Sequence, residues 1–180
     1  MGDEEDGGAD ERSATFEREA EPDSACEVAC VRVERGEITG RLVSLVRPPR
    51  RIFEFTDVHG ITWPRVARAP TFADLWPRLG PILDRVEFIA AHNARFDRGV
   101  LSACCERAGI ALPPAPFVCT VRLARRTWSL FPTTLPHVCA ALRIKLDHHR
   151  AASDSEACAR IVLAALDVGQ DPLACVLRAK

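Results

Sequence analysis

The stretch Val86-Glu-Phe-Ile-Ala-Ala-His-Asn-Ala-Arg-Phe-Asp97 (VEFIAAHNARFD) decides the fold. Residues 86–91 form a short apolar run typical of a buried β-strand, and a helix is expected from about Asp97 to Ala108, ended by Gly109. A carboxylate at the start of a helix is stabilised by the positive end of the helix dipole. Asp97 is therefore either a plain helix-capping residue or a carboxylate that reaches a metal ion at the end of the strand.

A β-hairpin is expected before this unit. Residues 25–34 and 38–46 show partial period-2 alternation of apolar and polar side chains, and Arg35-Gly36 lies between them as a turn. A helix is then expected to start at Thr71, because Asp74 three residues later completes a short-armed capping box. Gly80-Pro81 is expected to stop or kink that helix.

The remaining chain continues the alternation of strand and helix. A second short strand is expected at 117–120, and helices are expected over 121–130, 136–142 and 151–166. This order predicts an α/β fold in which a mixed β-sheet is flanked by helices.

Composition limits the class of protein. The 180-residue chain is 47% hydrophobic, which is enough for the core of one domain. Residues 1–23 hold ten acidic side chains and two arginines, and the rest of the chain carries a net charge of +7. No long apolar segment and no apolar leader is visible, so we expect a cytoplasmic protein with no membrane contact. A basic body favours polyanions, although an arginine-rich chain also follows from genomic base composition.

The eight cysteines do not follow metal-ligand spacing. The sequence contains no Cys-x-x-Cys pair, and most of the cysteines lie within apolar runs. Buried, reduced thiols are the simplest interpretation. A zinc-binding interaction domain is a weaker alternative, which stoichiometric zinc would reveal.

A second segment, His149-Arg-Ala-Ala-Ser-Asp154, pairs a loop histidine with an aspartate at the start of a helix. A carboxylate that holds a divalent cation and a histidine that accepts a proton from water suit metal-assisted hydrolysis. Each residue alone is more typical of a solvated surface, so the pairing with the segment around Asp97 carries the hypothesis.

Together these segments resemble the DEDDh (DnaQ-like) 3′–5′ exonucleases, a group that includes the proofreading epsilon subunit of bacterial DNA polymerase III. His92-Asn-Ala-Arg-Phe-Asp97 is similar to the second motif of the family, and His149-x-Ala-x-x-Asp154 is similar to the third. Val58-His59-Gly60-Ile61-Thr62 resembles the segment that lines the nucleotide pocket. The resemblance implies a ribonuclease-H-like mixed sheet with helices on both faces and two bound Mg²⁺ or Mn²⁺ ions.

The resemblance also implies the role of each matched residue. Asp97 and Asp154 would be metal ligands, and His149 would be the general base. The side chains that would contact the substrate are His59, Gly60, Ile61, Asn93 and Phe96. The implied partners are single-stranded nucleic-acid 3′ ends, DNA rather than RNA, and a DNA polymerase subunit.

The first motif departs from the family pattern. The family has Asp-x-Glu at the end of an apolar first strand, whereas this chain has Thr15-Phe16-Glu17. A register two residues later gives Glu17-Arg18-Glu19, so Glu17 is the acid common to both registers and the expected third catalytic carboxylate and metal ligand. A neutral Thr15 removes one anionic ligand, and the second metal ion would then bind weakly.

Three explanations for this departure remain open. The chain is a member with weakened or lost catalysis, or Glu17 and Glu19 replace the usual pair, or the sequence before about residue 20 is not the native start of the domain. The abrupt change in composition near Asp23 favours the third. We expect residues 1–14 to be a disordered acidic tail, residues 15–168 the exonuclease domain and residues 169–180 a C-terminal tail. A nucleic-acid-binding module without catalysis is the alternative function.

Overall fold

The computed structural model describes residues 25–51, 60–148 and 150–177. Its first unit is a hairpin of β1 (Glu27–Glu34) and β2 (Glu37–Leu45), paired antiparallel as predicted. Arg35 and Gly36 form the turn, both with positive φ (52° and 81°), as a two-residue type I′ turn requires. Gly40 pairs with Arg32, and a Cβ at Gly40 would lie 3.3 Å from that of Arg32. The glycine therefore leaves room for the arginine side chain.

Helix α4 (Phe72–Leu83) begins with the predicted capping box. The hydroxyl of Thr71 accepts a hydrogen bond from the Asp74 backbone, and the Asp74 carboxylate accepts one from the Thr71 backbone. Gly80-Pro81 does not stop the helix, the first of the two expected outcomes, because α4 continues to Leu83, which is buried in the core. A short helix that the sequence did not predict, α3 (Trp63–Val66), precedes α4.

Two further strands form a separate parallel pair, β3 (Ile89–Ala91) and β4 (Phe117–Cys119). Both are shorter than predicted, with three residues each. Among the described residues the strands therefore form two two-stranded sheets, β1–β2 and β3–β4. The helices that follow these strands are α5 (Ala94–Ala108) and α6 (Thr120–Trp128), and the chain continues into α7 (Leu135–Ala141) and α8 (Ala151–Asp167).

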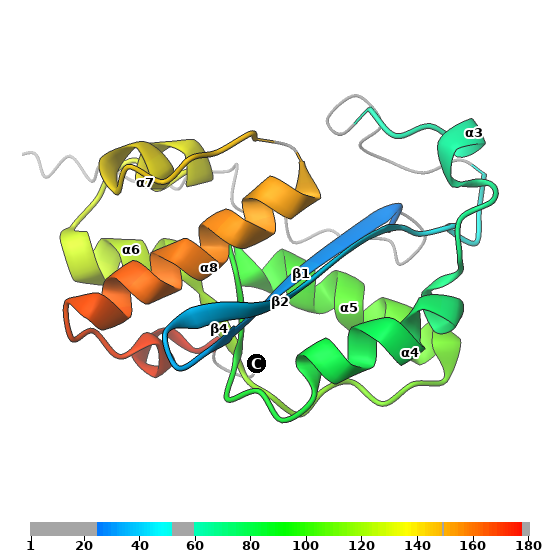
Figure 1. The fold of residues 1–180 in the computed structure, drawn as a ribbon, viewed down its shortest axis with the longest axis horizontal. Helices are drawn as coiled ribbons and strands as arrows, with labels where there is room; N and C mark the ends of the chain where they lie inside the picture. Colours follow the sequence, from blue (N-terminus) through cyan, green and yellow to red (C-terminus); the bar gives the residue numbers. More distant parts are fainter. Residues whose placement is uncertain (1–24, 52–59, 149, 178–180) are drawn as a thin grey trace, which may run out of the picture.

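The hairpin lies between two groups of helices (Figure 1). On one side, Val28 and Cys30 of β1 pack with the leucines of α4, namely Leu75, Leu79 and Leu83. On the other side, α8 lies along β1 and also packs against α6, α7 and β3. Helix α8 is therefore the element that joins the hairpin to the rest of the core.

The expected C-terminal tail is partly wrong. A 3-10 helix, η2 (Pro172–Cys175), packs on β4, and Val176 forms a bridge with Val118. Cys175 is buried in a cluster with Val118 and Leu123. The apolar side chains of this segment cover β4, so the packed fold extends to the end of the described residues.

All eight cysteines are free thiols, and seven of them are buried. No helix among the described residues is long and apolar enough to span a bilayer.

Candidate active site

Asp97 lies in the first turn of α5, where the predicted strand-to-helix segment places it. The chain enters this helix through Asn93, which has a left-handed conformation (φ 66°, ψ 50°), and the backbone N–H of Phe96 donates to the Asn93 carbonyl at 3.0 Å. The residue is exposed at its outer edge, but protein atoms crowd its carboxyl group. This burial raises the pKa of Asp97 to about 6, against a smaller lowering by its own backbone N–H.

Asp154 lies in the first turn of α8, also as predicted, and its backbone N–H donates to the carbonyl of Arg150 at 2.9 Å. Its Oδ1 atom is 3.2 Å from Nδ1 of His148. The sequence pattern pointed to the neighbouring histidine, His149, which lies outside the described residues. The two consecutive histidines, His148 and His149, were the signal in the sequence that either one could lie beside Asp154.

Cys158 lies one helical turn after Asp154, and the charges of both carboxylates act on its thiol. Burial raises the pKa of the Cys158 thiol to about 12, and the nearby negative charges of Asp97 and Asp154 add to the increase. The side chain of Thr120 and the backbone of His92 are hydrogen-bond partners of the thiol. Because the charges of both carboxylates act on one buried thiol, Asp97 and Asp154 lie on the same side of the core as Cys158.

His92 links the structural elements around this site through hydrogen bonds. Its Nε2 atom is 2.8 Å from the carbonyl of Thr133, which can only accept, so Nε2 carries the proton. Nδ1 lies 2.9 Å from the hydroxyl of Thr120, the first residue of α6, and accepts from it in the neutral tautomer. Burial lowers the pKa of His92, which favours that neutral form. His92 thus ties β3 to the starts of α6 and α7, a role that its motif did not reveal.

The other predicted site residues lie at different depths. Asn93 and Phe96 are exposed beside Asp97, and Phe96 is 39% exposed although it is apolar. Gly60 is exposed with a positive φ of 66°. Ile61 is buried with Cys26 and Val66, so only its backbone could face a nucleotide. Glu17 and His59 lie outside the described residues.

The donor set suits hard cations, because carboxylate oxygens are the ligands that Mg²⁺ and Mn²⁺ prefer. Mg²⁺ commonly binds to one or two carboxylates and keeps several waters. Asp97 and Asp154 therefore have the donor chemistry that such an ion takes. Within the described part of the chain no cluster of three or more His, Cys, Asp or Glu side chains is arranged to hold a metal.

The comparisons with known proteins identify the class. The exonuclease family RNase T matches residues 14–162, so this chain belongs to that family. The matched region includes Thr15-Phe16-Glu17.

Curated relatives share about a third of the aligned residues. The chain is 35% identical over 141 residues to a PolC-type DNA polymerase III of Oceanobacillus iheyensis, covering 75% of this chain and 10% of the relative. It is 37% identical over 103 residues to exodeoxyribonuclease 10 of Escherichia coli K12, covering 57% of this chain and 41% of the relative. The chain thus spans less than half of the length of these relatives.

Solved structures confirm the ribonuclease-H-like fold. Exonuclease X in complex with 5′-overhanging duplex DNA matches with a TM-score of 0.67 and 28% identity over 83% of this chain and 87% of that one. The nuclease domain of 3′hExo, a DEDDh family member bound to rAMP, has the same fold, with a TM-score of 0.64 and 17% identity over 87% and 98% of the two chains. The predicted family and fold class are therefore confirmed.

Proposed function

We propose that this chain is a metal-dependent 3′–5′ exonuclease that hydrolyses phosphodiester bonds at nucleic-acid 3′ ends. The observation that carries the proposal is the placement of Asp97 and Asp154, each in the first turn of a helix, where the charges of both carboxylates act on the buried Cys158 thiol. A bound Mg²⁺ or Mn²⁺ ion would supply activation of the attacking water and neutralisation of charge on the phosphate.

The side chains have separate tasks in this reaction. Asp97 and Asp154 hold the cation, and both are placed at helix starts, where the helix dipole favours an anion. His149 takes the proton from the attacking water, as its motif position implies. His148 contacts Oδ1 of Asp154 and orients that carboxylate. Glu17 is the proposed additional acid, and with Thr15 in place of the family aspartate the second metal ion binds weakly.

The proposed substrate is single-stranded DNA rather than RNA, and the PolC relatives support a polymerase subunit as partner. A second candidate function is nucleic-acid binding without hydrolysis. It is supported by the presence, among the described residues, of only two carboxylates whose charges act on Cys158.

Hydrolysis of a fluorescent single-stranded oligonucleotide with Mg²⁺ or Mn²⁺ separates these functions. With a 5′ label, a 3′–5′ exonuclease gives a ladder of progressively shorter labelled products, and DNA and RNA versions compare the substrates. Asp97→Ala, Asp154→Ala and His149→Ala should each lower the rate at least about a hundredfold. The matched control is His148→Gln, which leaves the proposed base in place and should cost less than His149→Gln.

Binding without turnover in the wild-type chain would favour the module. Near-normal activity in Asp97→Ala or His149→Ala would show that the assigned roles are wrong. A 3′-terminal phosphate that left the rate unchanged would contradict attack at a free 3′ end.

A further inference from the structure

The surface around α3 is rich in arginine. Between Val46 and Ala73 the described residues include five arginines and no acidic residue. Each of them is exposed, as is Arg107 near the end of α5. We call these six side chains the α3 arginine surface, and its members are Arg47, Arg50, Arg51, Arg65, Arg68 and Arg107.

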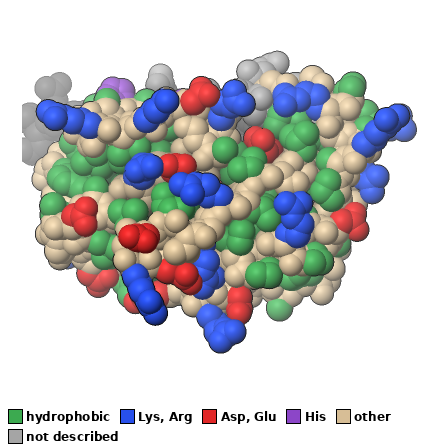
Figure 2. All heavy atoms as spheres, in the orientation of Figure 1, with side chains coloured by type: hydrophobic (Ala, Val, Ile, Leu, Met, Phe, Trp, Pro, Cys, Tyr) green, Lys and Arg blue, Asp and Glu red, His purple; other side chains and the backbone are tan. Residues whose placement is uncertain are grey.

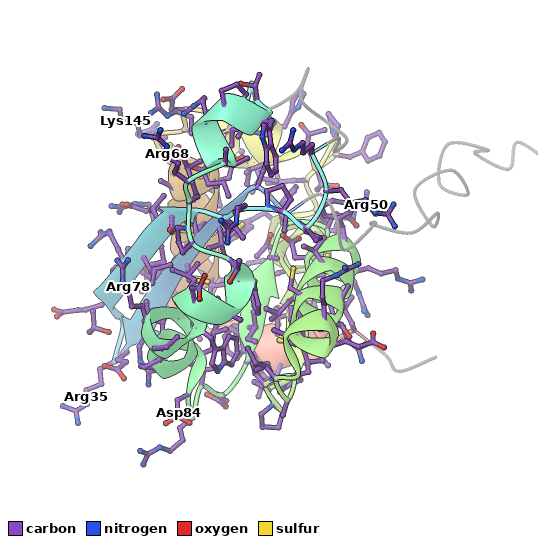
Figure 3. The ribbon with its side chains drawn as sticks, turned by 90° about the vertical axis from the view of Figure 1, so that its right-hand side faces the viewer. Arg35, Arg50, Arg68, Arg78, Asp84 and Lys145 are labelled. Carbon is purple, nitrogen blue, oxygen red and sulfur yellow. The ribbon has the colours of Figure 1, made fainter. Side chains whose placement is uncertain are left out.

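The fold gathers these arginines although they come from three segments. The backbone N–H of Arg47 donates to the carbonyl of Pro70 at 2.8 Å, which holds the end of β2 against the connection between α3 and α4. Arg65 is close enough to Cys26 for its charge to lower the pKa of that thiol, against a larger increase from burial. In Figure 3 Arg68 and Arg50 lie on opposite sides of the end that carries α3, so the surface extends around that end. Several arginine side chains are also visible on the α3 half of the face in Figure 2.

An apolar recess lies within this surface. Its volume is about 360 Å³, and its walls include Trp63, Phe72, Pro48 and Pro49. Arg47 and Arg107 also line it. Aromatic and proline side chains beside cations are the combination with which proteins bind unpaired bases and the phosphates between them.

A cation–π pair lies next to the recess. The guanidinium carbon of Arg51 lies 5.6 Å from the centroid of the Trp63 ring, within the range of a cation–π contact. A planar guanidinium on an indole offers a surface on which a nucleobase can stack.

The recess lies away from the candidate active site but can be reached by one strand. Asp97 lies near the start of α5, and Cys104 and Arg107 near its end line the recess. Ten residues of helix span about 15 Å. At the ~3.4 Å rise of a stacked strand, this is four or five nucleotides.

We propose that the α3 arginine surface and its recess bind the single-stranded part of a nucleic acid several nucleotides away from the end that occupies the candidate active site. The inference rests on the proposed function for its substrate class. Charge complementarity selects the occupant, since phosphodiester strands carry one negative charge per nucleotide and this surface holds six arginines, with Asp74 beside Arg47 and Glu27 near Cys26 as nearby acids.

The test is binding without catalysis. A 5′-fluorescein dT12 oligonucleotide is titrated with the full chain in EDTA, from 20 to 200 mM NaCl, and followed by fluorescence anisotropy, with U12 as the RNA arm. The double variant Arg65→Gln/Arg68→Gln should weaken binding about tenfold and reduce the slope of log K against log [salt] by about 1.4, the value for two single-strand phosphate contacts.

The matched control removes two exposed arginines elsewhere. Arg35→Gln/Arg78→Gln causes the same charge change, at the hairpin turn and on α4, which lie away from Arg50 and Arg68 in Figure 3. It should change the affinity by less than about twofold. Trp63→Leu should weaken binding about tenfold and Trp63→Phe much less, because a base stacks on the cation–π pair. Thermal melting verifies that each variant is folded.

Equal losses in the two double variants would overturn the proposal, since binding would then follow net charge alone. Absence of dT12 and U12 binding by the wild-type chain would also overturn it. Because the titration contains EDTA, it measures strand binding alone. Strand binding here together with no hydrolysis in the separate Mg²⁺ or Mn²⁺ assay would refute the nuclease proposal and leave this inference standing.

Discussion

Arg32 connects the hairpin to the end of α4, and its loss should destabilise the fold measurably. Its Nη1 atom lies 3.2, 3.0 and 2.9 Å from the carbonyls of Pro81, Ile82 and Asp84, and its Nε donates to Glu34 at 2.8 Å. Nη1 has only two hydrogens, so the three carbonyls share two donors. These carbonyls lie at a helix end, where no intrahelical donor remains.

The expected cost of Arg32→Ala follows from these bonds. A hydrogen bond between a charged group and a buried partner contributes about 1.5–3 kcal/mol. Only the bond to Ile82 is partly buried; the other carbonyls are exposed and regain water, and the Glu34 pair contributes a few tenths of a kcal/mol. The free energy of unfolding should therefore fall by about 2 kcal/mol, or roughly 4–8 °C in Tm.

Urea unfolding followed by tryptophan fluorescence measures this loss. Arg85→Ala is the control, because Arg85 pairs with Asp84 and its side chain is 90% exposed. It should cost less than about 0.5 kcal/mol. Arg32→Lys should recover part of the loss, since an ammonium keeps the charge but not the fork of donors. If Arg32→Ala unfolds within 0.5 kcal/mol of wild type at an unchanged m-value, the role assigned to Arg32 is incorrect.

Three more outcomes are expected. Thr71→Ala should cost about 1 kcal/mol of stability by removing the capping box, and Thr71→Ser should keep most of it; equal unfolding curves for all three chains would contradict this. Burial lowers the pKa of His92 from 6.5, so the unfolded chain binds a proton that the folded chain does not. The contribution of His92 to stability should therefore fall as the pH drops below 6.5, whereas the raised pKa of Asp97 acts in the opposite direction below about 6. The difference in stability between the wild type and His92→Gln should accordingly shrink from pH 8 to pH 5; parallel profiles would argue against it. Burial raises the pKa of Cys158 to about 12, so this thiol should resist a thiol reagent at pH 8 until urea unfolds the chain; fast labelling of Cys158 in the native protein would refute its burial.

Local signals predicted the fold where a few neighbouring residues determine the conformation. The turn at Arg35-Gly36 fixed the hairpin, and the Thr71 and Asp74 pair fixed the start of α4. The end of α4 could not be predicted, because burial of Leu83 and the contact with Arg32 come from distant parts of the chain. The lengths of β3 and β4 could not be predicted for the same reason, because β3 ends where its partner β4 ends.

The site was predictable at the level of its two motifs. Asp97 and Asp154 lie in the first turns of their helices, as their positions after strand and loop indicated. The contact of His148 with Asp154, the hydrogen bonds of His92 and the position of Cys158 required the folded chain. Contacts between separate elements depend on how the helices pack, and the spacing of residues in the sequence does not specify that packing.

The position of α8 couples two properties of the chain. Its first turn carries Asp154, while its later turns bury Ile161 and Val162 between the hairpin, α6 and α7. A change in this buried portion, such as Ile161→Val, is expected to shift the helix whose first turn bears Asp154, the proposed metal ligand. Core substitutions in this helix, far from the substrate, are thus expected to lower both turnover and melting temperature. Turnover and stability therefore cannot evolve independently at these positions.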